Sequence, residues 1–143
     1  MLSDDQCLAW FRPGFTNLDE VFPNPFLGVE DLTERERWPT AATAIKCALR
    51  WRGSVRLSAR LHAQTADDQL HTVRYEDLVT RPTEVIDGVS GYLGTPISKV
   101  ALADIDDQGV DAWRDRLTRK QVTQVDRIAG TELRRLGYQP STG

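Results

Sequence analysis

Residues 73–82 are Val-Arg-Tyr-Glu-Asp-Leu-Val-Thr-Arg-Pro, and this stretch decides the predicted fold class. β-Branched and aromatic side chains between Leu70 and Tyr75 favour a strand. Pro82 suits the first turn of a helix, and the acidic pair Glu76–Asp77 between them suits a turn or helix cap. The stretch therefore predicts a strand, a turn and then a helix, an order typical of α/β proteins.

A long helix is predicted before this stretch. Apolar residues recur at helical spacing over residues 45–59. Thr33 starts one capping-box pattern, and Pro39 offers a second start. Gly53 weakens the helix locally and leaves room for close packing. The helix also carries a row of arginines, interpreted either as an anion-binding row or as a solvated face: Arg50, Arg52, Arg56 and Arg60.

Two more helices are predicted after the stretch. Residues 80–92 carry inward-facing apolar residues and stop at Gly94. The last helix begins at a Thr118–Gln121 capping box. It ends before Gly137, the residue type that favours the left-handed conformation after a helix.

Only one convincing strand is predicted, and a lone strand cannot satisfy its backbone hydrogen bonds. The chain by itself is therefore expected to be mostly α-helical with about one strand. It is expected to be part of an α/β fold whose remaining strands are missing or come from another chain. Residues 1–143 form a single partial domain in this interpretation, with an irregular segment at 1–32 and a helix-strand-helix-helix region at 33–143.

Composition limits the classes of partner. The net charge of −3 and pI near 5.4 argue against general nucleic-acid binding. The sequence has no apolar run of transmembrane length and no signal-peptide pattern at its start. We therefore expect no membrane partner and a cytoplasmic protein.

The segment 1–32 is rich in aromatic residues and proline. This composition prevents a long helix but is too apolar for a disordered tail. Its aromatic side chains are expected to pack on this chain's core, or to form an acceptor-binding or subunit-contact surface. The second option makes the protein an interaction module that self-associates as a homo-oligomer.

Residues 73–82, the helix end at 92–96 and the segment 113–118 together resemble the C-terminal region of bacterial sulfotransferases. In that family a strand ends in Tyr-Glu-Asp-Leu, and a proline-started helix then closes in a Leu-Gly-x-Pro turn. A Trp-Arg pair later leads into a last helix that ends in Leu-Gly-Tyr. The resemblance extends over nearly the whole chain from about Trp38 onward, more loosely over residues 1–37, and implies an α/β fold. It also implies sulfuryl transfer from 3′-phosphoadenosine 5′-phosphosulfate (PAPS) to a hydroxyl or amine.

The resemblance places three cofactor-binding residues in this chain. Tyr75 matches a tyrosine that lies beside the adenine, and Trp113 and Arg114 match a loop that approaches the 3′-phosphate. The family's Gly-rich phosphosulfate loop and its catalytic base match nothing in this sequence. No catalytic residue is therefore assigned, and the chain alone is expected to be inactive as a sulfotransferase.

The loop before Trp113 is acidic, with four aspartates between Asp104 and Asp111. Carboxylates at this density repel a phosphate. Residues 104–115 also match several positions of an EF-hand calcium loop, with Gly109 at the position of the required glycine. Calcium binding is therefore an alternative interpretation of this loop, and a solvated acidic loop is the simpler one. No metal ligand is assigned.

Overall fold

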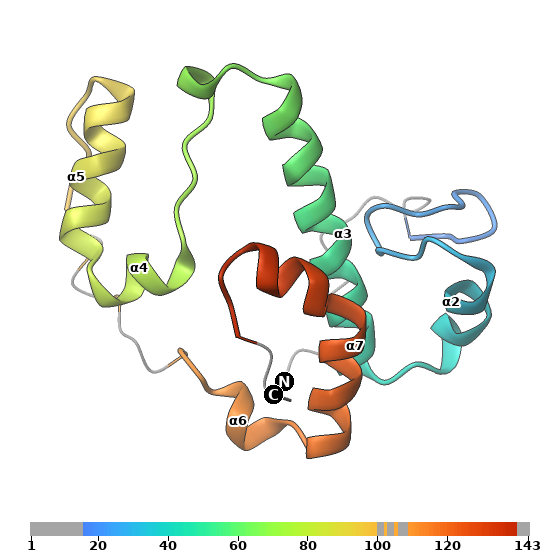
Figure 1. Cartoon of the computed structure of the whole chain (residues 1–143). Helices are drawn as coiled ribbons and strands as arrows, with labels where there is room; N and C mark the ends of the chain where they lie inside the picture. The colour runs from blue at the N-terminus through green and yellow to red at the C-terminus, as the bar shows by residue number, and fades with distance from the viewer. Residues whose placement is uncertain (1–15, 100–101, 103–104, 106–108, 140–143) are drawn as a thin grey trace. The chain divides into compact units, whose positions relative to one another are not determined.

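The computed structural model describes residues 16–99, 102, 105 and 109–139. Helices dominate this part of the chain (Figure 1). The elements are α2 (Leu32–Arg37), the 3₁₀ turn η1 (Trp38–Thr40), α3 (Thr43–Gln64), the 3₁₀ turn η2 (Asp67–Gln69), α4 (Tyr75–Thr80), α5 (Pro82–Leu93), α6 (Trp113–Arg116) and α7 (Arg119–Arg135). The chain forms two compact units, with residues 1–63 and 117–143 in the first and residues 64–116 in the second. No helix in the described ranges is long and apolar enough to cross a membrane.

The first unit has its core between α3, α7 and the loop 16–31, which we call the N-terminal loop. Leu27, Val29, Trp38 and Leu49 are buried together. Ile128 of α7 packs against them. Phe22 also packs against this core, whereas Phe26 is 38% exposed.

Close backbone contact joins the N-terminal loop to α3. A Cβ atom at Gly28 would lie 1.8 Å from the Leu49 carbonyl oxygen, and Gly28 has a φ of +68°. A Cβ atom at Gly53 would lie 2.5 Å from the Pro25 carbonyl oxygen. Only glycine fits at either position, so the expectation that Gly53 permits close packing is confirmed.

The start of the predicted long helix differs from both expectations. Asp31 caps a separate short helix, α2, by accepting a hydrogen bond from the Glu34 amide at 2.8 Å. Trp38 to Thr40 then form a 3₁₀ turn, and α3 begins only at Thr43. Pro39 explains the break, because proline lacks the amide hydrogen that a continuous helix needs.

The helix ends predicted downstream are confirmed. α5 begins at Pro82 and closes on Gly94, whose φ is +65°. α7 begins at a complete Thr118–Gln121 capping box. It ends at Arg135, Gly137 follows with a φ of +81°, and the Tyr138 amide donates to the Leu133 carbonyl at 2.9 Å.

The predicted strand at residues 70–75 does not form. Leu70 and Arg74 are extended, but no strand is assigned there, and the chain enters α4 already at Tyr75. The one β pairing in the described ranges is an isolated bridge between Asn24 and Val29. An extended segment becomes a strand only beside another strand, so the "mostly α-helical" prediction is confirmed and the strand is not.

The second unit has little core. Val79 is the one buried residue among its described residues. The His71 and Tyr92 rings stack with centroids 4.9 Å apart, which ties the extended segment to the end of α5. Arg81 pairs with Asp77 at 2.7 Å and joins the end of α4 to the start of α5. The unit is therefore held largely by surface contacts.

Candidate functional site

Tyr75 stands at the first position of α4 in the second unit. Its side chain is 57% exposed, so a ring face is available to a ligand. Its hydroxyl lies 3.0 Å from the place that a Cβ atom at Gly109 would occupy. Tyr75 therefore contacts the segment that leads to α6, although the two are distant in sequence.

Trp113 and Arg114 open α6 in the same unit. The turn before them is closed by hydrogen bonds from the Ala112 amide to the Gly109 carbonyl and from the Arg114 amide to the Asp111 carbonyl. The Arg114 guanidinium lies over the Trp113 ring at 4.6 Å and pairs with Asp111 at 3.2 Å. The Arg114 side chain remains 61% exposed, so its guanidinium can still bind an anion.

The structure thus brings the three sequence-predicted residues into one unit, with Gly109 linking Tyr75 to the turn before α6. Asp111 has a positive φ of 62° there. Three of the four aspartates of the acidic loop, Asp104, Asp106 and Asp107, lie outside the described residues, as does most of the calcium pattern. Within the described ranges, no group of three His, Cys, Asp or Glu side chains could hold a metal ion.

A second candidate region lies in the first unit, where the arginine row of α3 meets carboxylates from other elements. Arg52 is 8% exposed, and its guanidinium donates to the Gly28 carbonyl at 2.6 Å and contacts Glu34 at 2.8 Å. Glu34 also accepts a hydrogen bond from the Glu30 amide. Arg52 therefore holds the N-terminal loop and α2 on α3, which neither predicted role of the arginine row described.

Arg56 joins three elements through two carboxylates. Its Nε atom donates to Glu132 of α7 at 2.7 Å, and its terminal nitrogen contacts Glu30 of the N-terminal loop. The hydrogen bond that Arg56 donates to Glu132 is the largest cause of a raised pKa at Arg56. Glu132 is only 5% exposed. Burial raises the pKa of its carboxyl, but the bonds and charges of Arg56, a backbone hydrogen bond and the charge of Arg52 outweigh burial and hold it below its ordinary value.

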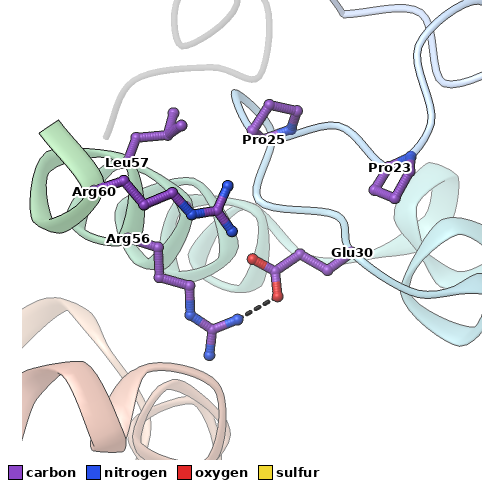
Figure 2. A pocket seen from close by; sticks show the side chains of 7 residues that line it. Pro23, Pro25, Glu30, Arg56, Leu57 and Arg60 are labelled. Carbon is purple, nitrogen blue, oxygen red and sulfur yellow. Dashed lines mark hydrogen bonds and ion pairs between the residues drawn. The ribbon is translucent and has the colours of Figure 1, made fainter. Parts of the chain in front are cut away.

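A pocket of about 380 Å³ opens beside this network. Figure 2 shows its wall from α3 facing its wall from the N-terminal loop. The Arg60 guanidinium extends from α3 toward the loop that carries Pro25 and Glu30 (Figure 2). The lining residues are Pro23, Pro25, Glu30, Gly53, Arg56, Leu57 and Arg60.

Sequence reasoning missed the carboxylates of this network. One signal was present, because Glu132 stands four residues after Ile128 and four before Leu136 and so interrupts the apolar stripe of α7. A charge on a buried helix face predicts a charged partner. Glu30 gave no such signal, since it lies in an irregular loop.

Comparison with known proteins adds no assignment. No protein-family model matches the chain. No solved structure matches it significantly. The resemblance to sulfotransferases therefore stays a prediction.

Proposed function

We propose that this chain is the C-terminal part of a PAPS-dependent sulfotransferase-like α/β protein, and that its second unit contacts the adenosine 3′-phosphate end of the cofactor. One observation carries the proposal. Tyr75, from the motif that suggests the family, has its hydroxyl beside Gly109, in the turn that leads to Trp113 and Arg114. Two motifs far apart in sequence meet in one unit.

The exposed groups supply suitable chemistry for this contact. An adenine ring can stack on the Tyr75 face. A phosphate can accept hydrogen bonds from the exposed Arg114 guanidinium, whose plane is held by the Trp113 ring. Asp111 competes for the same guanidinium, so the contact is expected to be weak in this chain alone.

Binding of 3′-phosphoadenosine 5′-phosphate to the purified chain tests the proposal. Its adenine and 3′-phosphate report on the two contacts without the phosphosulfate loop. We expect weak saturable binding that Tyr75→Ala removes. Leu93→Ala is the control, since Leu93 is another exposed large side chain of the same unit. Equal binding to the wild type and Tyr75→Ala, or no binding at all, contradicts the nucleotide contact.

The purified chain is expected to show no sulfuryl transfer from PAPS. Its sequence offers no Gly-rich loop whose backbone amides would hold the transferring group. Turnover of PAPS by the chain alone would overturn this part of the proposal.

Self-association is a second candidate function, and one observation favours it. Among the described residues of the second unit only Val79 is buried, while Val73, Tyr75, Tyr92 and Leu93 are exposed. The predicted contact surface was instead the aromatic segment, of which Phe22 packs on the core of its own chain. Sedimentation equilibrium tests it, and a monomer at all concentrations counts against it.

A further inference from the structure

We propose that the pocket between α3 and the N-terminal loop binds a small monoanionic carboxylate with an apolar body. The pocket lies entirely in the first unit, so this inference is independent of the nucleotide contact proposed for the second. Its volume of about 380 Å³ is at the small end of ligand pockets, which suits a single small molecule.

Arg60 supplies the binding charge. It is exposed on α3, and within the described part of the chain it forms no ion pair. Its guanidinium reaches toward the opposite wall of the pocket (Figure 2). A planar guanidinium can donate two parallel hydrogen bonds to one carboxylate, so Arg60 is the anchoring group.

The neighbouring charges select a single negative charge. Arg56 and Arg60 carry two positive charges in the pocket lining, against one negative charge on Glu30. Glu30 is already paired with Arg56, which leaves the charge of Arg60 to be balanced. A second negative charge on the ligand would face the Glu30 carboxylate, which disfavours dianions such as phosphate esters.

The remaining walls favour an apolar body. Pro23 and Pro25 stand on the loop side, and Leu57 stands on the α3 side (Figure 2). Gly53 has no side chain that could fill the pocket, and a Cβ atom at this position would collide with the Pro25 carbonyl oxygen. Burying apolar ligand surface against these residues adds affinity that a bare anion lacks.

Titration of the full chain with phenylacetate, followed by heteronuclear NMR and calorimetry, tests the inference. For a ligand of about ten non-hydrogen atoms we expect a Kd of about 1 mM, with shifts at Leu57 and Arg60. Arg60→Gln should weaken binding at least about tenfold, the effect of a lost charged hydrogen bond. Arg60→Lys should bind with intermediate affinity, since it keeps the charge without the fork.

Arg127→Gln is the matched control, because Arg127 is an exposed arginine of α7 outside the pocket. It should bind phenylacetate as the wild type does. Acetate should bind more weakly than phenylacetate because it lacks the apolar body. Inorganic phosphate should also bind more weakly, because it carries a second negative charge.

Three results would overturn the inference. They are unchanged affinity in Arg60→Gln, affinity for acetate or phosphate equal to that for phenylacetate, and absence of saturable binding in the millimolar range. Arg60 is exposed, so its variants are expected to fold, and an unchanged urea midpoint verifies this.

Discussion

The first unit buries an apolar core and a network of arginines and glutamates, whereas the second unit buries only Val79 among its described residues. Charged side chains have different roles in the two units. Arg52 and Glu132 are almost fully covered and join separate elements. Lys99–Asp87 and Arg81–Asp77 lie on the surface of the second unit, where ion pairs contribute little.

This difference in burial indicates which unit contributes more to the stability of the protein. Burial of apolar surface is the dominant favourable term in folding, and the first unit has most of it. The second unit combines exposed apolar residues with an extended segment that has no strand partner. The first unit therefore contributes most of the apolar burial in the described part of the chain.

Gly28→Ala is expected to have the largest effect. The added Cβ would collide with the Leu49 carbonyl, and the positive φ would strain alanine. Overpacking and left-handed strain together should lower the free energy of unfolding by about 3–4 kcal/mol. Urea denaturation measures the change. A variant as stable as the wild type would show that the loop does not rest on α3.

Glu132→Gln should destabilise the first unit by about 2 kcal/mol. It removes the charge that pairs with Arg56 inside the protein, but Arg56 keeps Glu30 and part of its solvent exposure. Asp87→Asn is the control in the second unit and should change stability by no more than about 0.5 kcal/mol. Equal effects of the two substitutions would contradict the difference between the units.

Acid should destabilise the protein partly through Glu132. The pKa of this carboxyl is lower in the folded state than its ordinary value, so the unfolded state binds the proton more readily. The stabilisation is complete above the unfolded pKa and is lost as the pH falls below about 5 and passes the folded pKa. Urea midpoints measured from neutral to acidic pH should fall less steeply in Glu132→Gln than in the wild type. Parallel curves would exclude Glu132 as a contributor.

Gly88→Ala should have the smallest effect, and it should raise the free energy of unfolding rather than lower it. Gly88 lies inside α5, and a Cβ atom there would meet nothing within 4 Å. Alanine should favour this helix by up to about 1 kcal/mol. Destabilisation by this variant would show that a surface of α5 is covered in solution, which would sharpen the case for self-association.

Local sequence patterns predicted several elements because the interactions that form them are local. The Thr118–Gln121 capping box, the start at Pro82 and the turns at Gly94 and Gly137 all satisfy backbone groups within a few residues. The family resemblance of residues 73–82, 92–96 and 113–118 predicted Tyr75, Trp113 and Arg114 as cofactor-binding residues. The contact of Tyr75 with Gly109 adds a spatial link that spacing alone did not contain.

The sequence by itself determined the helical character of the chain and the ends of α5 and α7, because propensity and capping act over one or two turns. Only the tertiary structure decided the roles of the α3 arginines. Arg52, Arg56 and Arg60 look alike in sequence, yet one is buried, one bridges two carboxylates and one faces a pocket. Glu30, Glu34 and Glu132, the partners of Arg52 and Arg56, come from other elements. Only folding brings those elements together. Whether the extended segment at residues 70–75 becomes a strand likewise depends on a neighbouring strand.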